Sequence, residues 1–169
     1  MINRTIVNKD SKTLLKLYQS LVRLKLEYCV QAWRPYLQKD IDLLEKVQRR
    51  ATRMMANDKS LSYYNRLKKF GLTTLETRRL RGDLIEVCKL FKGFDDVDFN
   101  VFFKLSSTHL RWHELKIYKP RTQLDVRTYF FSIRVIDVWN SLPGSIIHSN
   151  TVNNFKVKID CLLNYRGYI

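Results

Sequence analysis

The sequence predicts a mainly α fold, in which a helical N-terminal module is followed by a smaller α+β piece with a short β-hairpin. Apolar residues recur every three or four positions over most of the chain, as on the inner face of a helix. Pro35, Gly71 and Gly93 stand at the ends of such periodic segments, where helices stop. With 169 residues, of which 45% are hydrophobic, the chain is long enough to bury a core.

Two helices are expected in the first third of the chain. The first covers residues 12–33, is capped by Asp10 or Ser11, and ends before Pro35, because proline disfavours helical geometry in the residue before it. The second covers residues 39–55 and contains the stretch LEKVQRRATRMM. At helical spacing this stretch has an apolar stripe on one side, formed by Leu44, Val47, Ala51 and Met54, and a cationic stripe on the other, formed by Lys46, Arg49, Arg50 and Arg53.

This cationic stripe has two interpretations. A solvated helix face normally mixes signs, because Glu and Lys four residues apart support a helix. The stripe contains no acidic residue. Local reasoning therefore leaves two alternatives equally open, an ordinary solvent face and a surface that contacts phosphate.

Two more helices complete the N-terminal module, residues 1–93. The segment LSYYNRLKKFG is predicted to be a short helix, capped by Ser60 or Ser62 and stopped by Gly71. A longer helix follows, opened by Thr73 or Thr74 as in a capping box and ended by Gly93. Its core face is formed by Leu80, Leu84, Val87, Cys88 and Phe91, and Gly82 weakens its middle.

The remaining residues are interpreted as a linker, 94–111, and a small α+β module, 112–169. The segments ELKIYKP and QLDVRTY alternate apolar and polar residues, which predicts two strands that pair around Lys119 to Thr122. The segment 128–143 is predicted to contain a helix that ends at Asn140 and Ser141, before Pro143. A last helix within residues 151–165 turns Val152, Phe155, Ile159 and Leu162 inward.

The charge of the chain indicates its class of partner. A formal net charge of +15 indicates nucleic acid or, less often, an anionic membrane surface. Residues 1–93 carry 21 Lys and Arg against 9 Asp and Glu, a net charge of +12, and residues 94–169 carry 10 against 7, a net charge of +3. A membrane-surface helix needs an exposed apolar face. The apolar faces here are expected to pack in a core, so no membrane partner is expected.

No catalytic or metal-binding motif is visible. The cysteines are widely spaced and are expected to be free thiols packed in apolar surroundings, namely Cys29, Cys88 and Cys161. The histidines form no zinc-binding pattern. Asp95 and Asp96 follow Phe94 directly, unlike the aspartate pair of a polymerase turn, and are interpreted as an acidic loop near a helix start. With no signal peptide or membrane-spanning run in view, an intracellular chain is expected.

Further basic and aromatic residues extend the candidate surface. The additional cations are Lys68, Lys69, Arg78, Arg79 and Arg81. Four aromatic residues lie next to basic ones, so base stacking is an alternative to core packing for each of them, namely Trp33, Tyr63, Tyr64 and Trp112. The cations on consecutive helices are expected to reach phosphates.

The chain contains four strings, in this order: LYQSLVRLKLEYCVQAWRPYLQKDIDLLEKVQRRATRMM, LSYYNRLKKFGLTTLETRRLRGDLIEVCKLFKG, FFSIRVIDVWNSLP and NNFKVKID. Together they resemble a continuous stretch of the LINE-type (non-LTR) retrotransposon reverse transcriptases, most closely those of the chicken-repeat and jockey-like clades. The resemblance extends from about Leu14 to Asp160. Leu24 stands where relatives often have proline, and Trp112 where an Arg-Gly-His string is usual, which indicates a drifted copy.

The resemblance implies the region after the palm, with thumb-like helices and a C-terminal extension of an RNA-directed DNA polymerase. It places the catalytic aspartates and their Mg²⁺ in a palm domain outside this chain, so that this chain has no cofactor and is not catalytic by itself. The implied function is binding of the template–primer duplex backbone. The implied partners are RNA, DNA and the upstream reverse transcriptase domain, in a nuclear and cytoplasmic ribonucleoprotein. The alternative is a remnant helical interaction or structural module with no specific nucleic-acid role.

Overall fold

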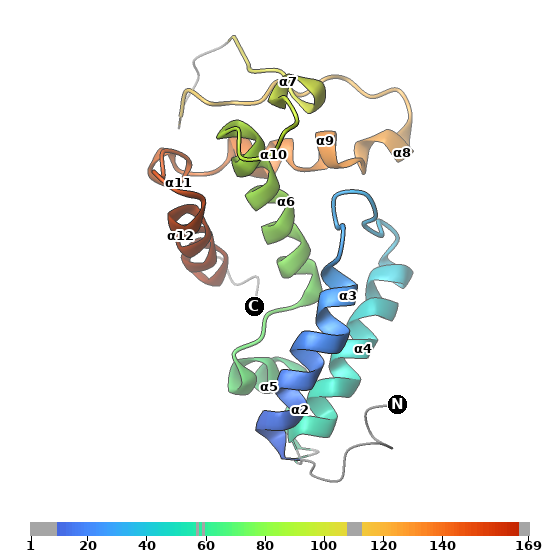
Figure 1. The fold of residues 1–169 in the computed structure, drawn as a ribbon. Coiled ribbons are helices and arrows are strands. Elements are labelled where there is room, and N and C mark those ends of the chain that lie inside the picture. Colours follow the sequence, from blue (N-terminus) through green and yellow to red (C-terminus); the bar gives the residue numbers. More distant parts are fainter. Residues whose placement is uncertain (1–9, 57, 59, 108–112, 166–169) are drawn as a thin grey trace. The chain divides into compact units, whose positions relative to one another are not determined.

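Helices form most of the protein (Figure 1), which confirms the mainly α class. The computed structural model describes residues 10–56, 58, 60–107 and 113–165. In chain order the helices are α2 (Ser11–Leu17), η1 (Tyr18–Arg23, a π-helical segment), α3 (Leu24–Glu27), α4 (Gln38–Ala56), α5 (Tyr63–Phe70), α6 (Leu75–Phe91), α7 (Phe99–Phe102), α8 (Asp125–Thr128), α9 (Phe131–Arg134), α10 (Ile136–Asn140), α11 (Gly144–Ile147) and α12 (Val152–Tyr165). Over the described ranges, no helix has the length and apolar character needed to cross a bilayer.

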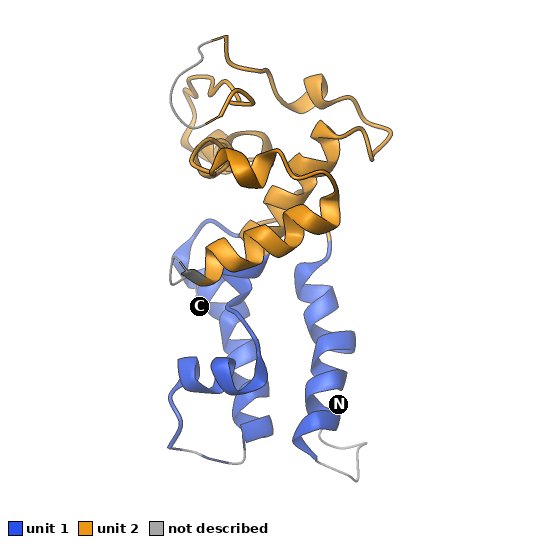
Figure 2. Ribbon diagram, turned by 90° about the vertical axis from the view of Figure 1, so that its left-hand side faces the viewer, with its two compact units in different colours: residues 1–28, 35–78, 168–169 blue, residues 29–34, 79–167 orange. Residues whose placement is uncertain are grey.

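The chain forms two compact units (Figure 2). Unit 1 comprises residues 1–28, 35–78 and 168–169, and unit 2 comprises residues 29–34 and 79–167. The division falls inside α6, between Arg78 and Arg79, whereas the boundary expected from the sequence follows Gly93. Each unit has a hydrophobic core of its own.

Unit 1 begins with a continuous helical run from Ser11 to Glu27, made of α2, η1 and α3. Asp10 caps this run, since its side chain accepts a hydrogen bond from the Lys12 N–H at 3.2 Å. Tyr28 is extended and Cys29 has a φ of 51°, so the helix ends at Glu27. The predicted helix over residues 12–33 is therefore too long, because the chain turns well before Pro35.

Local capping signals set the ends of α5 and α6 as predicted. The Ser62 side chain accepts from the Asn65 N–H at 3.3 Å, and Gly71, with a φ of 61°, ends α5 in the left-handed conformation that favours glycine. The Thr74 hydroxyl oxygen accepts from the Thr77 N–H at 3.2 Å at the start of α6. Gly93, with a φ of 64°, follows the end of α6.

The core of unit 2 lies between α6, α10 and α12. The predicted core face of α6 is confirmed, with Leu84, Val87 and Cys88 buried and Leu80 and Phe91 packed against them. In α12 the residues Phe155 and Ile159 are fully buried, and the half-buried Val152 and Leu162 pack against the same core. The predicted helix over residues 128–143 is divided into α9 and α10 at Val135.

The predicted β-hairpin around Lys119 to Thr122 is wrong. Within the described residues the only β pairing is an isolated antiparallel bridge between Leu105 and Ile117. The Asn140 side chain forms hydrogen bonds with both backbone polar groups of Ile117. It accepts from the Ile117 N–H at 2.9 Å and donates to the Ile117 carbonyl at 2.8 Å. The second predicted strand instead contains α8, where Val126 is exposed, so the apolar alternation there does not mark a buried face.

A buried aspartate joins residues 29–34 to the rest of unit 2. The Asp83 carboxylate accepts from the Arg34 guanidinium at 3.1 Å and from two nitrogens of Arg134 at 2.9 and 3.0 Å. Arg134 also donates to the Val30 carbonyl at 3.0 Å. Because a buried charge is costly unless it is paired, these contacts hold the segment in place.

Candidate nucleic-acid interface

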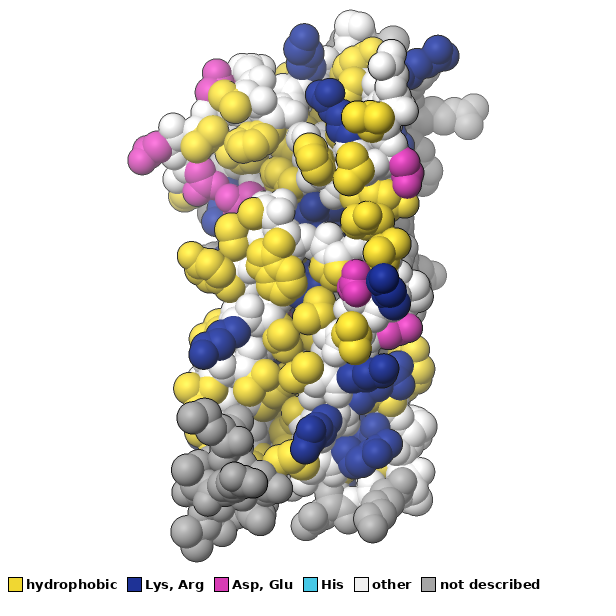
Figure 3. Space-filling view, turned by 90° about the vertical axis from the view of Figure 1, so that its right-hand side faces the viewer, with side chains coloured by type: hydrophobic (Ala, Val, Ile, Leu, Met, Phe, Trp, Pro, Cys, Tyr) yellow, Lys and Arg dark blue, Asp and Glu magenta, His cyan; other side chains and the backbone are white. Residues whose placement is uncertain are grey.

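The cationic stripe of α4 is exposed on unit 1. Together with Met54, its four side chains line a groove of about 620 Å³, and all four are solvent-exposed, namely Lys46, Arg49, Arg50 and Arg53. Within the described part of the chain, no carboxylate forms an ion pair with any of them. Figure 3 shows Lys and Arg side chains gathered on the lower part of one face, beside a run of hydrophobic side chains.

The buried face of α4 is polar over most of its length and apolar only at its end, at Met55 and Ala56, which corrects the predicted apolar stripe. Glu45, Gln48 and Thr52 are buried, and Gln48 is 0% exposed. Of the four predicted apolar residues, Val47 is 40% exposed, and the half-buried remainder are Leu44, Ala51 and Met54. Each of the three polar side chains has hydrogen-bond partners inside the protein, which removes the main cost of burying it.

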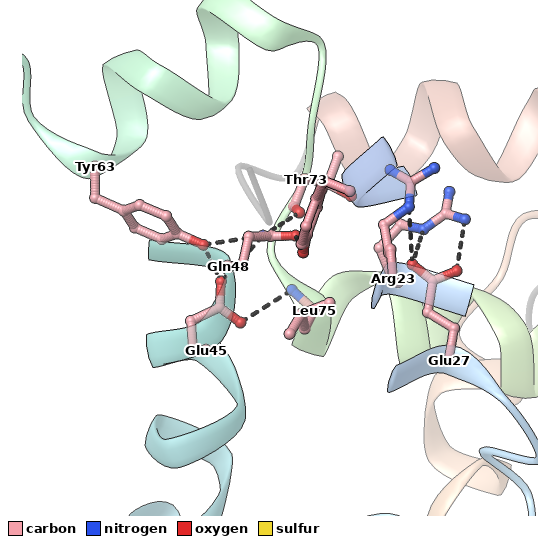
Figure 4. A network of polar contacts seen from close by, with 9 residues as sticks. Arg23, Glu27, Glu45, Gln48, Tyr63, Thr73 and Leu75 are labelled. Carbon is pink, nitrogen blue, oxygen red and sulfur yellow. Dashed lines mark hydrogen bonds and ion pairs between the residues drawn. The ribbon is translucent and has the colours of Figure 1, made fainter. Parts of the chain in front are cut away.

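Gln48 is the centre of this buried network (Figure 4). Its side-chain oxygen accepts from the Tyr18 hydroxyl at 2.7 Å, and its nitrogen donates to the Tyr63 hydroxyl and to the Thr73 carbonyl, both at 2.9 Å. The Tyr63 hydroxyl in turn donates to Glu45. The other Glu45 carboxylate oxygen accepts from the Leu75 N–H at 3.0 Å, at the N-terminus of α6. The network thus connects α4 to η1, α5 and the start of α6.

The network also positions one cation of the stripe. Burial raises the pKa of both the Tyr18 and the Tyr63 hydroxyl, and the hydrogen bond to Glu45 raises that of Tyr63 further. Both phenols therefore stay protonated and keep their places as hydrogen-bond donors. The guanidinium carbon of Arg49 lies 4.2 Å from the centroid of the Tyr63 ring, a cation–π contact. The fixed ring supports Arg49 at the surface of unit 1.

Two further predicted cations lie on the exposed side of α5. Lys68 and Lys69 are exposed in the last turn of α5, where the helix dipole favours positive charge. No ion pair involves either side chain in the described ranges. Since α5 packs against α4, these lysines lie in the same unit as the cationic stripe.

The three predicted cations of α6 make contacts within the protein. Arg78 is bidentate to Glu27, at 2.9 and 2.8 Å, and Arg81 is bidentate to Asp160. Arg79 is only 3% exposed, and its guanidinium lies 4.5 Å from the Trp33 ring centroid. Because these contacts occupy their guanidinium groups, we leave the three arginines out of the interface proposed below.

The aromatic candidates for base stacking have different environments. The Tyr63 ring is buried beneath Arg49, and the Trp33 ring forms a cation–π contact with Arg79. Tyr64 is exposed on α5. Trp112 lies outside the described residues.

The remaining chemistry-bearing residues form no metal site in the described ranges, where no group of three His, Cys, Asp or Glu side chains comes together. Asp95 and Asp96 lie in a loop before α7, whose first turn is capped by Asp98. Cys88 is buried as expected, but Cys29 and Cys161 are exposed, so the expectation of core packing is wrong for these two.

The buried network was the part of the site that sequence reasoning missed. Its signal is present, because Glu45, Gln48 and Thr52 follow the same helical spacing as a core face. Comparison of the chain with models of protein families, with curated proteins and with solved structures gave no match.

Proposed function

We propose that the protein binds nucleic acid through the exposed basic surface of α4 and α5. The phosphate-contacting residues are Lys46, Arg49, Arg50, Arg53, Lys68 and Lys69. The observation that carries the proposal is the cationic stripe of α4, which is exposed, lines one groove and pairs with no described carboxylate. Charges left unpaired on one surface repel one another, and phosphates relieve that repulsion with release of counterions.

The resemblance extends this proposal to a particular role. As the thumb and C-terminal part of a non-LTR retrotransposon reverse transcriptase, the protein would grip the backbone of a template–primer duplex. Catalysis and its Mg²⁺ would then belong to an upstream palm domain. Phosphate contacts suit this role because they position a protein on a duplex without reading its sequence.

A binding measurement on the full chain tests the proposal. In the stripe variant, Lys46, Arg49, Arg50 and Arg53 are replaced by Gln. In the control variant, four other exposed cations are replaced by Gln with the same loss of charge, namely Lys12, Lys16, Lys104 and Arg121. We expect fluorescence anisotropy on a labelled RNA–DNA duplex to show an affinity loss of at least about tenfold for the stripe variant. The affinity falls because the variant contacts fewer phosphates and so releases fewer counterions from the duplex. Equal losses in both variants would refute a specific interface.

A second candidate function is a helical interaction module. Exposed apolar residues of unit 1 favour it, namely Leu21, Leu24, Leu43 and Val47. Exposed apolar side chains that run together on one face, as in Figure 3, mark a surface that another protein covers. If the unmodified chain bound neither RNA nor DNA at low salt, this second function would replace the first.

A further inference from the structure

We propose that Tyr64 is a base-stacking platform, so that the interface takes single-stranded nucleic acid with an unpaired base on the Tyr64 ring. The inference rests on the proposed function, because a base reaches Tyr64 only when the neighbouring cations hold the strand. It adds to that function a substrate class, a strand with at least one unpaired base.

The ring of Tyr64 is available to a ligand. Tyr64 is 59% exposed, so the face of its ring is open to solvent. The Tyr64 ring centroid is 5.7 Å from that of Tyr63, and the two rings are tilted by 54°. Since Tyr63 is held from behind by Glu45 and Gln48, Tyr64 extends from a fixed part of α5.

Two cations of the proposed interface lie close to this aromatic pair. On the α4 side, the Arg49 guanidinium covers the Tyr63 ring at 4.2 Å. On the α5 side, Lys68 follows Tyr64 by one helical turn, so both side chains lie on the same exposed face. We therefore place Tyr64 beside the path of a strand that Arg49 and Lys68 hold.

Base stacking favours a single strand over an intact duplex for this contact. Bases in a duplex are stacked on one another, whereas an unpaired base can turn its face to an aromatic side chain. Stacking of this kind tolerates any sequence, as phosphate contacts do. An exposed aromatic ring beside a positively charged surface is the combination that single-strand binding proteins use.

The test compares two probes and three variants of the full chain. The probes are a labelled oligothymidine and a labelled DNA duplex of equal length. Tyr64→Leu removes the π face and keeps an apolar side chain, and Tyr64→Phe keeps the ring. Tyr118→Leu is the matched control, because Tyr118 is a 55% exposed tyrosine in unit 2.

We expect Tyr64→Leu to weaken oligothymidine binding by about fivefold or more and duplex binding by less than about twofold. Tyr64→Phe and Tyr118→Leu should bind oligothymidine as the unmodified chain does. Unchanged oligothymidine binding by Tyr64→Leu, or equal losses on both probes, overturns the stacking role while the phosphate interface stands. If the unmodified chain binds neither probe, the proposed function itself fails.

Discussion

Replacing Tyr63 by Phe removes one hydroxyl from the buried network behind the interface. That hydroxyl donates to Glu45 and accepts from the Gln48 amide at 2.9 Å. Gln48 keeps its bond to the Thr73 carbonyl, and Glu45 keeps its bond from the Leu75 N–H. The main loss is therefore one hydrogen bond to a buried charged group.

A hydrogen bond to a charged group contributes about 1.5–3 kcal/mol, so we expect the free energy of unfolding to fall by about 2 kcal/mol. The same change should lower the Tm by about 4–8 °C for a protein of this size. The ring stays in place under Arg49, and duplex affinity should therefore change little.

Urea unfolding followed by far-UV circular dichroism measures the loss. Tyr64→Phe is the matched control, since it removes the hydroxyl of an exposed tyrosine one position along α5. A loss below about 0.5 kcal/mol for Tyr63→Phe, or an equal loss in the control, would refute the reasoning, because such values are typical of surface substitutions.

Three further predictions concern other parts of the molecule. Gly82→Ala should stabilise the protein by up to about 1 kcal/mol in thermal unfolding, because a Cβ at this position meets no atom within 4 Å and alanine favours the helix. A destabilised variant would contradict this prediction. Burial lowers the pKa of His113, and Lys116 and His148 lower it further. The unfolded chain then binds more protons, so stability should fall as the pH drops below about 6.5, and His113→Gln should reduce that fall in urea titrations. Burial also raises the pKa of Cys88, so maleimide should label the two exposed cysteines of the native protein while Cys88 reacts only on unfolding.

Local signals in the sequence predicted the limits of α5 and the start of α6. Ser62 and Gly71 set the limits of α5 through contacts with their near neighbours, and such contacts are visible in a sequence. The end of the first helix was missed because Tyr28 and Cys29 leave helical geometry without proline or glycine. Their turn brings residues 29–34 to Asp83. The ion pairs of Asp83 with Arg34 and Arg134 join side chains that are distant in the sequence.

The candidate site was predicted only in part, because some of its contacts join residues that are distant in the sequence. The exposed stripe of α4 follows from helical spacing, which places Lys46 and Arg53 on one side of the helix. The buried face of α4 was not predictable from apolar spacing. It contains Gln48, which is buried because it forms hydrogen bonds with three other segments of the chain. Arg79 and Arg81 resemble free surface cations in the sequence, and only the fold reveals their contacts with Trp33 and Asp160.

The salt dependence of duplex binding tests the central claim most directly. Each phosphate contact on duplex DNA contributes about 0.9 to the slope of log K against log salt. Replacing Lys46, Arg49, Arg50 and Arg53 by Gln should therefore flatten the slope by about 3–4 units, while the control variant keeps the slope of the unmodified chain. A folded stripe variant that keeps the full slope would contradict the account and make the stripe of α4 an ordinary solvent face.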